Sequence, residues 1–224
     1  MKKVISSIIT IVLFIMLFDF TGSAQETYKF WDFCIVSYDG DETNISLPTE
    51  DNRGEPVVRI GEKVFSKTNI STVYIPDEYR WIHTEAFSYC ENLVSVRLPE
   101  TLVVIEPYAF YGCPNLTYLF IPKNMWAIGD CAFGFEQNDS FRAYVYSNSV
   151  GEKYCIESEV QYVVIDKEFD LNQDGEVDVV DAMLLFYHVA QKSTLKNGFG
   201  DINHDNVIDI SDAMILFYFI AKKV

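Results

Sequence analysis

Residues 82–104 read IHTEAFSYCENLVSVRLPETLVV, and residues 105–127 read IEPYAFYGCPNLTYLFIPKNMWA. Both stretches begin with Ile, continue to Ala-Phe and Cys-x-Asn-Leu, and reach a Pro after an apolar run. A third copy, IGDCAFGFEQNDSFRAYVYS, begins at Ile128, and a degenerate copy, IGEKVFSKTNISTVYIP, begins at Ile60. Self-similarity at a fixed period of this length is typical of a solenoid, in which each unit buries its apolar side against its neighbours.

Two ladders of apolar side chains are expected to form the core. The segments NLVSVRLP and NLTYLFIP alternate with the period of a β-strand. One ladder is made of strand residues, and the other of the recurring Phe: Leu93, Val96, Leu98, Leu116, Leu119 and Ile121; Phe65, Phe87, Phe110 and Phe133. Pro76, Pro99 and Pro122 should end the strands, because Pro cannot donate to a ladder. The prediction is a mainly β solenoid with a period of about 23 residues.

Both ends of this solenoid need a cap. We expect a strand-rich cap over residues 28–60, and a short helix over 150–156 followed by an apolar strand at the other end. The chain has five cysteines, an odd number that cannot pair completely within one chain. Cys90 and Cys113 lie one repeat apart, which favours small buried side chains in the core. The disulfide state of the five stays open.

The frame I-x-x-x-A-F with Leu-x-x-Val-x-Leu-Pro resembles the BspA-type leucine-rich repeats of bacterial surface and secreted proteins, over about residues 28–166. The commoner leucine-rich repeat has Asn after its strand, whereas Asn92 and Asn115 precede it here. The resemblance implies a right-handed leucine-rich-repeat solenoid that binds a protein or a surface through an outward face. The expected outward residues, strand by strand, are Thr72 and Tyr74, Ser95 and Arg97, Tyr118 and Phe120, Ala143 and Val145.

Four of these outward residues, Tyr74, Arg97, Tyr118 and Phe120, would form an exposed patch of aromatic rings and arginine. That composition is common at binding hot spots. The alternative is that they only stabilise one another as cross-strand pairs.

The N-terminal residues 1–24 have the pattern of a secretory signal peptide. Lys2 and Lys3 precede an apolar run, and Gly22-Ser23-Ala24 suits cleavage. The alternative, a membrane anchor, is disfavoured because about 15 apolar residues fall short of the roughly 20 that span a bilayer. The net charge of −16 argues against nucleic acid and anionic membranes as partners. We expect a secreted protein without a membrane span.

Near the C-terminus, residues 170–182 read DLNQDGEVDVVDA and residues 201–213 read DINHDNVIDISDA. A twelve-residue loop with oxygen atoms at alternate steps can wrap a hard cation such as calcium. The expected ligands of two Ca²⁺ ions are Asp170, Asn172, Asp174, the carbonyl of Glu176, Asp178 and Asp181 in one loop, and Asp201, Asn203, Asp205, the carbonyl of Val207, Asp209 and Asp212 in the other. The alternative is two solvated turns whose Asp residues cap helices.

Each acidic loop leads into an apolar helix, DAMLLFYHVAQK or DAMILFYFIAKK, and neither is preceded by a helical pattern. A duplicated loop-helix with Asp at step 12 is similar to a type I dockerin, a small all-α module, over about residues 167–224. The resemblance implies calcium-dependent binding to a cohesin module of a scaffoldin in a cellulosome. It also implies cohesin contacts at Val179, Val180, Phe186, Tyr187 and Gln191 in the first copy, and at Ile210, Ser211, Phe217, Tyr218 and Lys222 in the second.

No catalytic motif stands out. His83, His188 and His204 are dispersed, and none lies in a recognisable hydrolase or metalloprotease pattern. The resulting hypothesis is a secreted, non-catalytic cellulosome component, with domains at 25–166 and 167–224. One alternative stays open: a cellulosomal enzyme or enzyme regulator, directed at polysaccharide or protein, with its site on the repeats. A calcium sensor is disfavoured, because the acidic loops lack entering helices.

Overall fold

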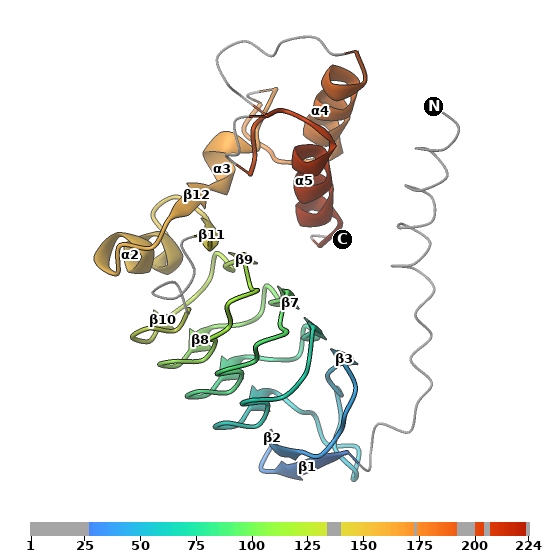
Figure 1. Cartoon of the computed structure of the whole chain (residues 1–224), viewed down its shortest axis with the longest axis vertical. Helices are drawn as coiled ribbons and strands as arrows, with labels where there is room; N and C mark the ends of the chain where they lie inside the picture. Colours follow the sequence, from blue (N-terminus) through green and yellow to red (C-terminus); the bar gives the residue numbers. More distant parts are fainter. Residues whose placement is uncertain (1–26, 134–139, 173, 192–199, 204–206, 223–224) are drawn as a thin grey trace.

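The computed structural model describes residues 27–133, 140–172, 174–191, 200–203 and 207–222. The expected signal peptide at 1–24, and the positions of His204 and Asp205, lie outside the described residues. Within the described parts, no helix combines the length and the apolar composition needed to cross a membrane. The described chain forms a β-solenoid that is followed by two helices at its C-terminal end (Figure 1).

One side of the solenoid is a six-stranded sheet in the order β1-β2-β4-β6-β8-β10. Its strands are β1 (Tyr28–Trp31), β2 (Cys34–Tyr38), β4 (Arg59–Ile60), β6 (Trp81–Ile82), β8 (Val104–Ile105) and β10 (Ala127–Ile128). β1 and β2 form an antiparallel hairpin, and every later pair is parallel. The hairpin covers the first turn of the repeats, which confirms the expected strand-rich N-terminal cap.

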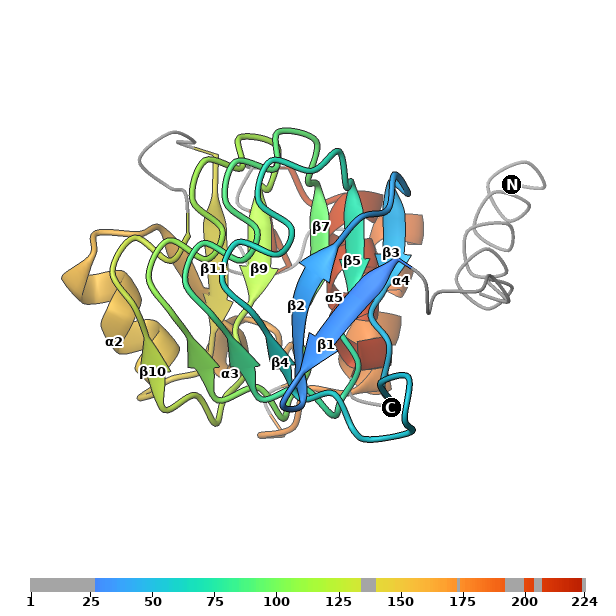
Figure 2. The same ribbon diagram turned by 90° about the horizontal axis from the view of Figure 1, so that it is seen from below.

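The other side consists of the strands that the alternating segments predict. They form two three-stranded sheets: β3 (Asn44–Ser46), β5 (Thr72–Tyr74) and β7 (Ser95–Arg97); β9 (Tyr118–Phe120), β11 (Arg142–Val145) and β12 (Tyr162–Val164). Pairing within both sheets is parallel. β7 and β9 lie next to each other without belonging to one sheet. One strand from each row per repeat gives the two-sided solenoid visible in Figure 2.

The core contains both predicted ladders, and all ten predicted ladder residues are buried. The rings of Phe65 and Phe87 stack with centroids 4.9 Å apart and planes at 6°, and those of Phe87 and Phe110 stack at 5.2 Å and 1°. Such rings bury large apolar areas in a fixed geometry, which ties each repeat to the next one.

Cys34, Cys90, Cys113 and Cys155 are buried free thiols, and Cys131 is half-buried. The Cys90 thiol donates to the carbonyl of Phe65 at 3.0 Å, and the Cys113 thiol donates to that of Phe87 at 3.1 Å. Each therefore links a repeat to the preceding one. This confirms the interpretation of these two residues as core side chains.

The C-terminal end is closed by α2 (Val150–Glu157), which lies beside β10, β11 and β12. Ser149 caps α2 by accepting a hydrogen bond from the Glu152 N–H, and the Glu152 carboxylate accepts from the N–H of Asn148, the residue before the cap. The expected helix and strand of the cap are both present. α3 (Ile165–Glu168) then leads to α4 (Val179–Gln191) and α5 (Ile210–Lys222), which pack against each other.

Candidate functional site

The outward face of the repeats becomes progressively more buried toward the C-terminus. Register pairs Tyr74 with Arg97 across β5 and β7, and Phe120 with Tyr144 across β9 and β11. Tyr74 is 47% exposed, whereas Phe120 is 4% and Tyr144 is 2% exposed. The Arg97 guanidinium lies over the Tyr74 ring, 4.7 Å from its centroid. Tyr74 and Arg97 thus form a cross-strand pair, the arrangement that the alternative interpretation described.

Two expectations for this face are wrong. Phe120 is buried rather than exposed, and Tyr118 is half-buried, because aromatic residues from the C-terminal helices cover them. Ala143 and Val145 point into the solenoid core, and Arg142 and Tyr144 take the outward positions instead. The strand of the last repeat is therefore offset by one residue from the expected alignment. An offset of one residue moves every side chain of a strand to the opposite face.

The covering contact is an aromatic cluster. The rings of Phe120 and Tyr144 stack at 4.7 Å on the outward face. Phe219 of α5 lies 5.4 Å from Phe120 and 5.3 Å from Phe169 between centroids, and Phe169 lies 5.8 Å from Tyr144. The Tyr144 hydroxyl donates to the carbonyl of Ile202 at 3.2 Å. The repeats and the C-terminal helices consequently share one buried cluster. Figure 1 shows these helices at the C-terminal end of the solenoid.

The two acidic loops fold alike around their step-12 carboxylates. Asp181 is buried and accepts the N–H groups of Leu171, Asn172 and Asp178 at 2.7 to 3.1 Å. Asp212 is also buried and accepts the corresponding N–H groups, those of Ile202, Asn203 and Asp209, at 2.7 to 3.1 Å. Burial raises the pKa of Asp212 above its usual value, although these three hydrogen bonds oppose the shift.

The remaining side chains of the first loop also bond to its own backbone. Asp170 accepts from the N–H groups of Asp174 and Gly175, and Asn172 accepts from that of Asp174. Gly175 has φ +93°, the left-handed conformation expected of the sharp turn at step 6. Asp178 and Asp209 accept from the N–H groups of Val180 and Ser211, so each caps the helix that follows, as the capping alternative foresees.

The donor set of these loops suits a hard cation, because the side chains at the ligand steps offer carboxylate or amide oxygens. Across the described residues, no three His, Cys, Asp or Glu side chains gather into a group that could hold a metal ion. The carboxylates accept hydrogen bonds from loop N–H groups. A carboxylate has about four lone-pair sites, so these bonds leave acceptor sites that a cation could use.

The residues expected to contact a cohesin differ between the two helices. On α4, Val179, Val180 and Tyr187 are exposed and Phe186 is half-buried. On α5, Ile210 and Phe217 are exposed, whereas Ser211 and Tyr218 are half-buried. Phe186 and Phe217 contact each other edge to face at 5.7 Å. The side chains of Gln191 and Lys222 lie outside the described residues.

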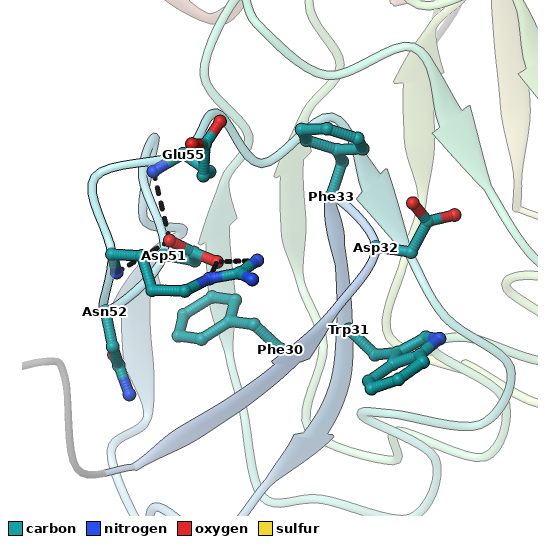
Figure 3. Close-up of a pocket in the computed structure, with 8 residues that line it drawn as sticks. Phe30, Trp31, Asp32, Phe33, Asp51, Asn52 and Glu55 are labelled. Carbon is teal, nitrogen blue, oxygen red and sulfur yellow. Dashed lines mark hydrogen bonds and ion pairs between the residues drawn. The ribbon is translucent and has the colours of Figure 1, made fainter.

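A second candidate site, which the sequence analysis did not identify, is a cleft of about 670 Å³ in the N-terminal cap. Figure 3 shows the β1–β2 turn with Trp31, Asp32 and Phe33 on one side and the loop from Asp51 to Glu55 on the other. Trp31 is 76% exposed. The sequence signal for this site is Trp31-Asp32-Phe33, which places two large rings beside an Asp at a solvated hairpin turn.

The turn beside this cleft has an unusual backbone. Asp32 and Phe33 have φ of +48° and +61°, which a two-residue hairpin turn of type I′ requires but a bulky residue rarely adopts. Arg59 braces the turn through the carbonyl and the carboxylate of Asp32. On the other side, Asp51 accepts from Arg53 and from the Glu55 N–H. Both walls of the cleft are therefore preformed.

The described histidines have structural surroundings. His83 Nδ1 lies 3.1 Å from a Glu106 oxygen, and the same carboxylate accepts from Trp81 and Thr84. Burial works to raise the pKa of Glu106, but the hydrogen bonds from Trp81 and Thr84 hold it below its usual value. The Thr84 hydroxyl donates to this carboxylate rather than to the histidine, so the group is not arranged as a nucleophile and base. His188 is buried.

These features define a class of protein: a leucine-rich-repeat solenoid that ends in a duplicated loop-helix module. The family model of the BspA type leucine rich repeat region matches residues 58–173 in six copies, and the chain belongs to this family. The family model of the dockerin type I domain matches residues 168–221, which include α4 and all but the last residue of α5. Both resemblances seen in the sequence are confirmed.

Solved structures similar to this chain are leucine-rich repeat proteins. One from Bacteroides capillosus ATCC 29799 is 30% identical, with 54% of this chain and 93% of that chain covered and a TM-score of 0.47. The T. pallidum protein TpLRR is 26% identical, with 50% and 56% covered and a TM-score of 0.44. A leucine rich cell surface protein from Faecalibacterium prausnitzii A2-165 is 22% identical, with 58% and 34% covered and a TM-score of 0.47. No curated protein matched the chain.

The two family matches define the general nature of the protein. Leucine-rich repeats and dockerins are non-catalytic interaction modules, and dockerin type I domains bind calcium and pair with cohesins. Both module types are typical of extracellular or cell-surface proteins.

Proposed function

We propose that this protein is a secreted, non-catalytic cellulosome component, with a signal peptide at 1–24, repeats at 25–166 and a dockerin at 167–224. The dockerin binds two Ca²⁺ ions and, in that state, a cohesin module of a scaffoldin. The observation that carries the proposal is the pair of equivalent loops, in which Asp181 and Asp212 receive matching sets of three N–H groups.

Calcium dependence follows from the charge of the loops. The first loop alone holds Asp170, Asp174, Asp178 and Asp181, whose repulsion opposes compaction until a cation offsets it. Binding free energy then adds to the stability of the folded module.

The direct test titrates the full-length chain against an immobilised type I cohesin module, in calcium and in chelator. We expect binding in calcium only, with the double variant Asp181→Asn and Asp212→Asn as a calcium-binding control. Equal binding in chelator, or equal binding by the double variant, contradicts the calcium-dependent mechanism. No binding to any member of a cohesin panel contradicts the proposed partner.

The repeats supply the second half of the proposal, the binding of a protein or a surface. The N-terminal cleft supports this role, because it combines the exposed rings of Trp31 and Phe33 with the polar groups of Asn52 and Glu55. Exposed Trp next to polar groups is enriched at binding hot spots.

The test for the repeats is a pull-down from culture supernatant with Trp31→Ala and Trp126→Ala variants of the full chain. Trp126 is 74% exposed but does not line the cleft, so it is the matched control. We expect Trp31→Ala alone to lose ligands that the unaltered chain retains. Equal retention by both variants contradicts a binding role of the cleft.

A further inference from the structure

We propose that a cohesin reaches this chain only through α4, because the equivalent face of α5 is seated on the outward face of the repeats. This inference rests on the proposed cohesin binding. It adds that the two copies of the loop-helix motif have separate tasks, one for the partner and one for the chain's own solenoid.

The two helices present equivalent residues at an offset of 31. Met183, Leu184 and Tyr187 of α4 are exposed, and Tyr187 is 63% exposed. Their equivalents on α5 are Met214, Ile215 and Tyr218, and all three are half-buried. These three positions are therefore exposed on α4 and partly covered on α5, where Ile210 and Phe217 remain exposed.

The cover over α5 comes from β9 and the segment after β11. The Tyr218 ring lies 6.0 Å from that of Phe120, and the Phe219 ring lies 6.3 Å from that of Tyr146. The Tyr218 hydroxyl lies in the electrostatic neighbourhood of Ser95, Arg97 and Tyr118, and loss of solvent raises its pKa. α5 thus occupies part of the face that the sequence suggested for an external ligand (Figure 2).

One substitution between the copies favours this orientation of the module. Phe219 packs among Phe120, Phe169 and Tyr146, and its equivalent on α4 is His188. A half-turn of the module would bring the imidazole of His188 to the position of Phe219 against these rings. Burying a polar ring among aromatic side chains without a matched partner is costly. The aromatic contact surface of the repeats therefore favours the orientation in which α5 packs against it.

The face that stays free is apolar and continuous. Val179, Val180, Met183, Leu184 and Tyr187 are all exposed and recur at helical spacing along α4. A contiguous apolar patch on a soluble module marks a contact surface. The occupant that we assign to it is a cohesin with an apolar contact surface, because it adjoins the loop that the proposed function places in calcium-dependent binding.

The test uses two matched variants of the full-length chain, Tyr187→Ala and Tyr218→Ala, titrated in calcium against an immobilised type I cohesin module that binds the unaltered chain. We expect Tyr187→Ala to weaken binding at least tenfold and Tyr218→Ala to change it less than twofold. Comparable losses from both variants, or a larger loss from Tyr218→Ala, overturn the inference.

Masking of Tyr218 is measured separately, without a cohesin. Brief nitration with tetranitromethane, followed by mass spectrometry, should modify Tyr187 at least tenfold faster than Tyr218. Equal rates overturn the seating of α5, whatever the cohesin result. If Tyr218 is protected and the unaltered chain binds no cohesin, the proposed function and the partner named here are refuted, whereas the seating of α5 stands.

A third variant removes the cover. Phe120 belongs to the cluster shared with the C-terminal helices and not to the solenoid core, so Phe120→Ala should free α5 while the repeats stay folded. We expect Phe120→Ala to accelerate nitration of Tyr218. Combined with Tyr187→Ala, it should restore part of the cohesin affinity through α5. Unchanged nitration of Tyr218 in Phe120→Ala contradicts the assigned cover.

Discussion

The helices α4 and α5 have thirteen residues each and share Asp-Ala-Met near the start and Phe-Tyr near the end. The loops before them place matching hydrogen bonds on Asp181 and Asp212. Their surroundings nevertheless differ, since α5 packs on the repeats and α4 exposes its apolar face. The duplicated sequence gives both loop-helix copies the same local structure. The repeats then make the two copies different, because they contact α5.

Removal of calcium should have the largest effect on this comparison. In chelator we expect α4 to lose its protection against amide hydrogen exchange completely, because among the described helices and strands it packs chiefly against α5. α5 should keep partial protection, since Phe219 stays packed on Phe120 and Phe169. Hydrogen exchange with mass spectrometry on the full-length chain measures both helices at once.

The repeats are the internal control of that experiment, because their core ladders lie away from the loops. Protection of β5, β7 and β9 should not change in chelator. Equal loss of protection in α4 and α5 would show that contact with the repeats adds nothing to the stability of α5.

Substitution at the position where the copies differ should have the next largest effect. Phe219→Ala removes a ring buried among other aromatic rings, and we expect it to lower the free energy of unfolding of the C-terminal module by about 3–5 kcal/mol. His188→Ala at the equivalent position of α4 should lower it by about 1–2 kcal/mol. Urea unfolding in calcium, followed by helical circular dichroism, measures both.

Phe219 and His188 occupy equivalent positions in the two helices but have different surroundings. Phe219 contacts residues of the repeats, whereas His188 belongs to the matching turn of the helix that stays free. Equal losses of unfolding free energy from the two substitutions would show that contact with the repeats does not stabilise the module beyond its own core.

The sequence predicted the parts that local patterns determine. The recurring Phe and the alternating strands identify the core ladders, and Gly175 marks the turn of the first loop. Strands of two residues, such as β6 and β8, carry too short a pattern to be predicted. The register of β11 was misjudged because the last repeat lacks the Pro that fixes the alignment in the others.

The burial of Phe120 could not be read from its own repeat, because its partners Phe169 and Phe219 lie far along the chain. A signal was nevertheless present in the outward positions, where Ser95 and Arg97 are followed one repeat later by Tyr118 and Phe120. Large aromatic residues at outward positions of the later repeats indicate that something covers them. Only the structure shows that the cover belongs to the same chain.

High pH should have the smallest effect, and it tests one group in the contact between α5 and the repeats, the Tyr218 hydroxyl. Desolvation raises the pKa of Tyr218 to about 12, with Tyr118 adding to the shift and Arg97 and Ser95 opposing it. In the unfolded chain Tyr ionises near pH 10, so the stability that Tyr218 contributes is complete below pH 10 and is lost between about pH 10 and 12. We expect the unaltered chain to lose about 1–2 kcal/mol more of its unfolding free energy than Tyr218→Phe in this range, after allowance for residual solvent contact.

The contributions of other tyrosines with raised pKa values, such as Tyr154, cancel in the difference between the two chains. Tyr187→Phe, at the equivalent exposed position of α4, is the matched control and should follow the unaltered chain. Parallel stability curves for the unaltered chain and Tyr218→Phe up to pH 12 would mean that the Tyr218 hydroxyl is solvated and that α5 is not seated on the repeats.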